Sequence, residues 1–212
     1  SCTTPVSEGM EVETENETLT SSRRSVLKLL LSVYHDKGYK LDDTDNELYK
    51  WAHYYGLEPT KIMATKGRYD VDTDPNPFIW IDLNKCILCT RCIRACSEVQ
   101  GRFVWGISER GFEAHIAAGM DEDMIDARCE SCGACVAYCP TGALSLKPSV
   151  KSLPAEKKVT TTCSYCGVGC QFDLNVVDNQ IVRVTSNPNA PANGMHLCVK
   201  GRFGYSYVNH PD

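Results

Sequence analysis

Thirteen cysteines in a regular spacing constrain this 212-residue chain more than any other feature. Two identical C-x2-C-x2-C-x3-C runs begin at Cys86 and Cys129, and Pro140 directly follows the second run. A C-x2-C-x3-C group begins at Cys163, and Cys198 follows much later. Disulfides fit this pattern poorly, because gaps of two or three residues would force strained rings and the odd total leaves one thiol unpaired.

The doubled run of four cysteines is the pattern of bacterial ferredoxins, in which each run contributes ligands to two cubane clusters. Structural zinc is the alternative, since C-x2-C pairs also build tetrahedral zinc sites. Zinc sites use one or two such pairs, however, rather than two identical runs of four. The two runs therefore predict two [4Fe–4S] clusters.

The spacing also predicts how the two runs share their ligands. Three closely spaced thiolates in a turn can cap three irons of one cube, whereas the fourth cysteine starts the next helix and points away. The first cluster is thus predicted to bind Cys86, Cys89, Cys92 and Cys139, and the second to bind Cys129, Cys132, Cys135 and Cys96. Pro140 should then turn the chain away, and Gly133 and Ala134 should let the backbone approach the cube.

The third group supplies four thiolates for one further cubane: Cys163, Cys166, Cys170 and Cys198. Gly167 and Gly169 suit a loop folded tightly over a cluster. Zinc fits this group taken alone, but beside two ferredoxin runs a third [4Fe–4S] cluster is favoured. Lys200 lies two residues after Cys198. It is either part of a solvated basic turn or a cation beside an anionic cluster, where it would raise the reduction potential.

The charge and hydropathy of the chain exclude several classes of protein. The formal charge is −5 and the pI is about 5.6, whereas a nucleic-acid-binding protein should carry a basic face. The longest apolar stretch, Val26 to Val33, is short and contains Lys28 and Ser32, so no membrane span is expected. The first residues also lack the charged start and apolar core of a secretory signal.

Hydrophobic periodicity and turn residues predict an α+β fold made of small modules. A helix is expected from Thr20, capped by Ser21 or Ser22 and buried through Val26, Leu27, Leu30, Leu31 and Tyr34. A second helix is expected over 45–55, ending at Gly56. Strands are expected over 78–83, 103–107, 112–116, 172–177 and 180–185, the last two joined by a hairpin turn at Asp178-Asn179.

The last cysteine group resembles a known family. Cys163-Ser-Tyr-Cys166-Gly-Val-Gly-Cys170, together with His196-Leu-Cys198-Val-Lys200-Gly-Arg202-Phe-Gly-Tyr, resembles the opening [4Fe–4S] domain of molybdenum or tungsten bis-pterin oxidoreductases. The tail from Gly201 to Asp212 most resembles the catalytic subunit of cytoplasmic formate dehydrogenases. The start, Ser1 to Met10, is similar to the end of the plant-type [2Fe–2S] domain that opens such subunits. That domain also occurs in the large iron–sulfur subunit of NADH dehydrogenases and in iron hydrogenases.

The resemblance implies roles that the spacing alone does not give. Cys2 would be the last ligand of an upstream [2Fe–2S] cluster, and Lys200 would relay electrons between the third cubane and the pterin. Many relatives carry a cluster bound by one histidine and three cysteines ahead of the ferredoxin runs. Residues 3–85 contain no cysteine, so the helices around His35 and His53 are expected to remain as scaffold without that cluster.

The resemblance and the composition together divide the chain into five parts. They are a [2Fe–2S] domain tail (1–19), a helical segment (20–77), a double-cluster ferredoxin domain (78–146), a linker (147–158) and a bis-pterin-type [4Fe–4S] domain (159–212). The catalytic residues and the Mo or W bis-pterin guanine dinucleotide are expected in a continuation beyond Asp212, in the same chain or another.

The implied function is electron transfer in a cytoplasmic formate dehydrogenase, between the pterin site and a diaphorase, ferredoxin or other acceptor subunit. One alternative is a stand-alone polyferredoxin that carries electrons without a pterin. The other is an iron–sulfur subunit of an NADH dehydrogenase or hydrogenase. The third cysteine group argues against the hydrogenase, and the missing histidine–cysteine site argues against the NADH dehydrogenase.

Overall fold

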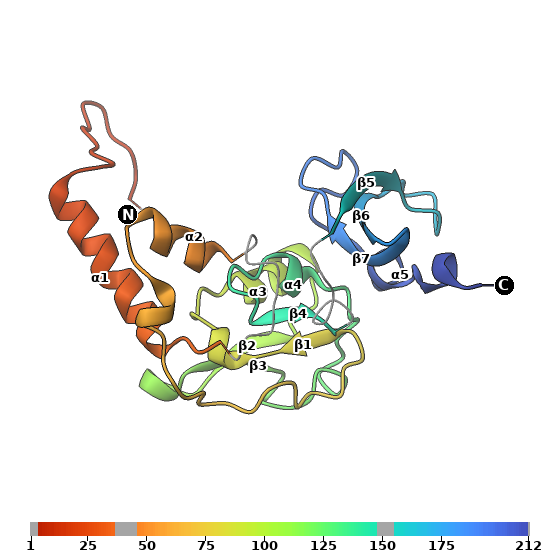
Figure 1. The fold of residues 1–212 in the computed structure, drawn as a ribbon, viewed down its shortest axis with the longest axis horizontal. Helices are drawn as coiled ribbons and strands as arrows, with labels where there is room; N and C mark the ends of the chain where they lie inside the picture. The colour runs from red at the N-terminus through yellow and green to blue at the C-terminus, as the bar shows by residue number, and fades with distance from the viewer. Residues whose placement is uncertain (1–3, 37–45, 148–154, 212) are drawn as a thin grey trace.

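A computed structural model describes residues 4–36, 46–147 and 155–211 of the chain, so Cys2 lies outside the described residues. The chain runs from two helices through a central part with two small sheets to a three-stranded sheet followed by a short helix (Figure 1). This mixture of helices and small antiparallel sheets is the α+β class predicted from the sequence. Among the described residues, no helix is both long and apolar enough to cross a membrane.

The N-terminal part pairs helix α1 (Glu17–Val33) with helix α2 (Glu47–Tyr54). The predicted start of α1 was wrong: its cap is Asn16, whose side-chain oxygen accepts a hydrogen bond from the Leu19 amide at 2.8 Å. Val26 is 56% exposed rather than buried, and the face of α1 that packs into the core carries Leu27, Leu30 and Leu31. The core of this part consists of Leu31, Tyr34, Leu48, Ala52 and Leu57.

The central part is closed by the pairing of β1 (Ile79–Ile81) with β4 (Leu144–Leu146), which joins its two ends. A second antiparallel pair is formed by β2 (Trp105–Ser108) and β3 (His115–Ala118). This hairpin was predicted, but both strands begin two or three residues later than expected. Phe103 has φ +54°, which is incompatible with a strand, and its side chain is 74% exposed.

The central core is built partly from the candidate ligands themselves. Cys92 and Cys135 are buried beside Ile79, Trp105 and Leu144, and four more cysteines of the two runs pack against this cluster. The helical part is tied to the end of the second run, since the Glu47 amide donates to the carbonyl oxygen of Pro140 at 2.8 Å. In this part of the chain, the packing of the hydrophobic core therefore also sets the positions of the candidate cysteine ligands.

The C-terminal part is a sheet in the order β5 (Lys157–Thr162), β6 (Gln171–Val177), β7 (Gln180–Ser186). The β6–β7 hairpin was predicted correctly: Asp178 and Asn179 both have positive φ, 48° and 60°, as a two-residue primed turn requires. Strand β5 was missed, and its first two residues fall within the predicted linker. Its sequence, KKVTTT, has no apolar alternation, and only the ladder with β6 makes it a strand.

Candidate iron–sulfur centres

The two identical cysteine runs fold into loops with the same backbone. In each loop the second and fourth residues after the first cysteine have positive φ: Leu88 and Thr90 in one, Ser131 and Gly133 in the other. Three of these four are not glycine, and such residues rarely adopt this conformation, which is typical of functional sites. Each loop then enters a short helix, α3 (Arg91–Arg94) or α4 (Ala134–Ala137).

Both loops turn a backbone amide toward their first cysteine. The Leu88 N–H donates to Cys86 Sγ at 3.4 Å, and the Ser131 N–H donates to Cys129 Sγ at 3.3 Å. Amide hydrogen bonds of this kind stabilise a thiolate and raise the reduction potential of a cluster bound to it. The repeated spacing therefore gives a repeated local geometry.

The first loop surrounds a small cavity that also reaches the last cysteine of the second run. Its lining includes the apolar side chains Ile116 and Leu144 and four cysteines, Cys86, Cys89, Cys92 and Cys139. Burial, together with Cys139, Cys86 and Cys89, raises the pKa of Cys92 to about 12. Burial likewise raises the pKa of Cys86 to about 11. Cys139 thus lies with the first loop, although it follows the second in sequence.

The second loop receives the last cysteine of the first run in the same way. Burial raises the pKa of Cys135 well above its ordinary value, with further contributions from Cys132 and Cys129. Burial also raises the pKa of Cys129, to which Cys132 and Cys96 add. The sulfur of Cys96 accepts a hydrogen bond from the Val104 amide at 3.3 Å. Cys96 thus lies close enough to Cys129 to affect its charge, as Cys132 does.

The third group is closed by the helix α5 (Val199–Phe203), which begins at Cys198. Partial burial raises the pKa of Cys170, and Cys163, Cys166 and Cys198 raise it further. The Gly201 amide donates to Cys198 Sγ at 3.5 Å. A Cβ on Gly201 would lie 3.7 Å from Cys163 Sγ and 4.0 Å from Cys198 Sγ, so both thiols lie over this glycine.

These three groups fit iron–sulfur clusters in their donor chemistry. Thiols with raised pKa values carry protons in the metal-free chain and release them when iron binds. Among the residues that the structure describes, no three His, Cys, Asp or Glu side chains lie close enough to hold a single metal ion. In a cubane cluster each thiolate binds a different iron. The four sulfurs therefore lie farther apart than ligands that share a single metal ion.

Three other residues were considered from the sequence: Lys200, His35 and His53. Lys200 lies near the third cysteine group, whereas the two histidines belong to the helical part. Lys200 is exposed in the first turn of α5, next to the third group. His53 is exposed, and the ring of His35 hydrogen-bonds through Nδ1 to the carbonyl oxygen of Ala64 at 2.8 Å. His35 follows α1 and His53 lies in α2, so both belong to the helical part, as expected for residues of a scaffold.

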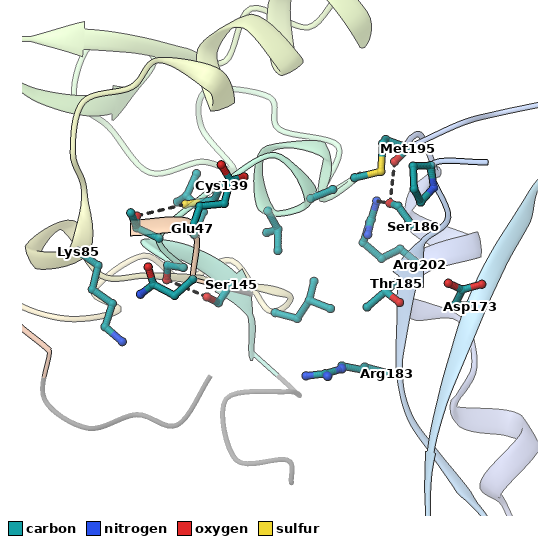
Figure 2. A pocket seen from close by; sticks show the side chains of 18 of the residues that line it. Glu47, Lys85, Cys139, Ser145, Asp173, Arg183, Thr185, Ser186, Met195 and Arg202 are labelled. Carbon is teal, nitrogen blue, oxygen red and sulfur yellow. Dashed lines mark hydrogen bonds between the residues drawn. The ribbon is translucent and has the colours of Figure 1, made fainter. Parts of the chain in front are cut away.

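Arg202 belongs to the motif that follows Cys198, but the motif assigns it no role. It is buried where the β5–β7 sheet meets the second cysteine loop. Figure 2 shows Arg202 beside Ser186 on one side of a cavity of about 440 Å³, with Cys139 and Ser145 on the other side. A sequence signal for this contact did exist in Gly133. The spacing assigns that glycine to the approach of the backbone to a cube, but the space next to its Cα is filled by Arg202.

Two known families match separate parts of the chain. Residues 76–145 match the ferredoxin-like domain of NADH-quinone oxidoreductase subunit 3, and residues 156–210 match the molybdopterin oxidoreductase Fe4S4 domain. The chain is therefore an iron–sulfur electron-transfer region of the type found in molybdopterin oxidoreductases and NADH-quinone oxidoreductases.

Individual relatives carry several oxidoreductase names. The chain is 36% identical over its whole length to NADPH-Fe(3+) oxidoreductase subunit alpha of Geobacter sulfurreducens and 32% identical to an NADH-quinone oxidoreductase subunit of Rhizobium meliloti. It is 26% identical, over 98% of its length, to a putative formate dehydrogenase of Staphylococcus haemolyticus. In each case it covers 25% of the relative, so it spans about a quarter of the length of these curated relatives.

A solved structure has a similar fold. A chain in the crystal structure of an NAD+-reducing [NiFe]-hydrogenase in the H2-reduced state superposes with a TM-score of 0.59 at 26% identity. The match covers 74% of this chain and 67% of that one.

Proposed function

We propose that the chain holds three [4Fe–4S] clusters and connects a molybdenum or tungsten bis-pterin site, in its continuation, to an NAD(P)H-linked or ferredoxin-type partner. When bound, each cluster accepts and releases one electron. The first cluster is assigned to Cys86, Cys89, Cys92 and Cys139, the second to Cys129, Cys132, Cys135 and Cys96, and the third to Cys163, Cys166, Cys170 and Cys198. Oxygen-labile clusters favour a reducing compartment, so we place the protein in the cytoplasm.

The observation that supports the proposal is that Cys139, the last cysteine of the second run, lines the cavity of the first loop with Cys86, Cys89 and Cys92. Cys139 raises the pKa of Cys86 and Cys92, and Cys96 raises that of Cys129. In the proposed assignment each ligand set draws on both runs, so that the two clusters would hold the two loops together. The chain's own task is to hold and orient these thiolates and to shield them from water.

We propose formate as the substrate of the pterin site. The support is the tail from Gly201 to Asp212, which resembles the catalytic subunit of cytoplasmic formate dehydrogenases, and the 26% identical relative named a putative formate dehydrogenase. A second candidate is an iron–sulfur subunit of an NAD(P)H dehydrogenase or hydrogenase complex. It is favoured by the 36% and 32% identical relatives and by the hydrogenase-like fold.

Metal content and reduction kinetics of the protein, purified without oxygen from its native host, test the proposal. Three cubanes require about 12 irons for this region. We expect this iron, any further iron from an upstream cluster, and one Mo or W, with cluster absorbance bleached on addition of formate. Bleaching by NAD(P)H but not by formate would favour the second candidate. About 12 irons without Mo or W would instead identify a self-contained electron carrier.

Replacing Lys200 by alanine tests the proposed electron relay. Lys200 is exposed and lies in the helix that begins at Cys198, so its loss should leave the iron content unchanged. We expect formate-dependent reduction of the clusters to slow by about tenfold or more, which corresponds to about 1.4 kcal/mol in the barrier. Stopped-flow absorbance measures the rate, and Lys157→Ala, which removes an exposed lysine of β5, is the control. Equal rates in both variants would make Lys200 part of a solvated turn.

A further inference from the structure

We propose that Arg202 is a positioning residue that fixes the β5–β7 sheet against the second cysteine loop and raises the reduction potential of the second cluster. This inference rests on the ligand assignment in the proposed function. Arg202 is buried, with 2% of its surface exposed, and lies four residues after Cys198 in the chain. One short helix therefore carries both a ligand of the third cluster and the side chain that contacts the loop of the second.

The guanidinium is held from two sides. Its Nε donates to the carbonyl oxygen of Cys132 at 2.9 Å, and its Nη2 donates to Ser186 Oγ at 2.9 Å. The Ser186 hydroxyl in turn donates to the carbonyl oxygen of Met195 at 2.6 Å. Arg202 thus links a candidate ligand residue of the second loop to the end of β7 and to the connection before α5. Figure 2 shows Arg202, Ser186 and Met195 close together.

The second loop is shaped to accept this side chain. Gly133 has φ +71°, and a Cβ placed on it would lie 2.4 Å from Arg202 Cδ and 2.6 Å from its Nε. Any larger residue would push the arginine away from the loop. Two aromatic stacks flank the contact: Phe78 on Phe203, with ring centres 4.5 Å apart, and Tyr138 on His196, 6.0 Å apart. The arginine therefore lies within a packed junction between the two parts.

The charge of Arg202 requires a partner inside that junction. Among the described residues, Arg202 forms no ion pair with a carboxylate, and an uncompensated buried charge is costly. Burial lowers the pKa of Arg202, and Cys132 and Cys135 oppose that effect when their thiols are ionised. A guanidinium remains protonated in proteins, so the second cluster and its thiolates supply the compensating charge.

The consequence for electron transfer follows from electrostatics. Reduction adds one negative charge to a cluster, and a buried cation nearby stabilises the reduced form more than the oxidised form. Arg202 should therefore raise the potential of the second cluster relative to the first, which has no such contact with it. By joining the loop of the second cluster to α5, it also fixes the separation between the second and third clusters.

The test compares Arg202→Met, which removes the charge, with Arg202→Lys, which keeps it, in holoprotein purified without oxygen. Cluster potentials are measured by redox titration followed by electron paramagnetic resonance. Signals are assigned by their loss in Cys89→Ala for the first cluster and Cys132→Ala for the second. We expect Arg202→Met to keep its iron but to shift the reduction equilibrium of the second cluster at least tenfold toward the oxidised form. That shift is about 59 mV for a one-electron couple.

Arg202→Lys should retain most of the wild-type potential, and so should the control Arg183→Met, which removes another buried arginine of the same part. If Arg202→Met loses iron, Arg202→Gln, which keeps hydrogen-bond donors without charge, replaces it in the comparison. Unchanged potential in the uncharged variant, or equal shifts in the lysine and uncharged variants, would overturn the inference. Absence of the second cluster from the wild-type protein would instead overturn the ligand assignment.

Discussion

Cys139→Ala is expected to remove the first cluster and leave the second in place, although Cys139 belongs to the second cysteine run. The reason is the proposed exchange of ligands between the loops, which is supported by the position of Cys139 in the cavity of the first loop together with Cys89 and Cys92. Loss of one thiolate exposes an iron of that cube and makes the cluster labile. Iron should fall from about 12 to about 8 per chain region, as measured by metal analysis of protein prepared without oxygen.

Electron paramagnetic resonance of the reduced protein identifies which cluster is lost. Cys139→Ala should reproduce the spectrum of Cys89→Ala, and Cys96→Ala should reproduce that of Cys132→Ala. Each pair combines one residue inside a loop with the distant residue that the structure brings beside it. If Cys139→Ala matched Cys132→Ala instead, each run would bind its own cluster and the crossed assignment would be refuted.

Removal of iron is expected to unfold the chain beyond Lys85. The central core contains Cys92 and Cys135, with four more candidate ligands packed around them, and the C-terminal core contains Cys163 and Cys170. The free energy of structural metal binding in small zinc domains is about 10–16 kcal/mol. This is as large as the whole free energy of unfolding of an ordinary domain, about 5–15 kcal/mol. Hydrogen exchange before and after anaerobic chelation should therefore show protection lost from residues 86–146 and 163–210.

The helical part provides an internal control for this experiment. Its core, formed by Leu31, Tyr34, Leu48, Ala52 and Leu57, contains no cysteine. Amides of α1 and α2 should consequently keep more protection after chelation than those of the two cysteine-rich parts. Uniform protection throughout the iron-free chain would mean that the apolar side chains suffice for folding and that the clusters contribute little to stability.

Elements fixed by short-range patterns were predictable from the sequence. The Asp178-Asn179 pair determines the β6–β7 hairpin, because both residues tolerate the positive φ that a two-residue turn demands. The second helix was likewise placed within two residues of its observed bounds. In the candidate site, the three loops of closely spaced cysteines follow from spacing, since residues two or three positions apart in sequence cannot lie far apart in space.

Elements that depend on distant partners were harder to predict. Strand β5 has the sequence of an exposed linker and is a strand only because β6 supplies its hydrogen bonds. The start of α1 was wrong because Ser21 and Ser22 look like caps, whereas Asn16 is the residue that accepts the first free amide. Several residues can cap a helix in isolation, and the extent of its packed face decides between them.

The sequence by itself determined the chemistry of this chain: thiolates in three groups, and loops whose backbone recurs wherever the spacing recurs. Both are local properties, set by a few covalently linked residues. The tertiary structure alone decided what lies between the groups, above all the insertion of Arg202 against Gly133 and Cys132, about 70 residues earlier in the chain. That contact requires two surfaces from distant parts of the chain to meet in one orientation. Gly133 leaves room for it, but nothing in the local sequence identifies Arg202 as the side chain that fills the space.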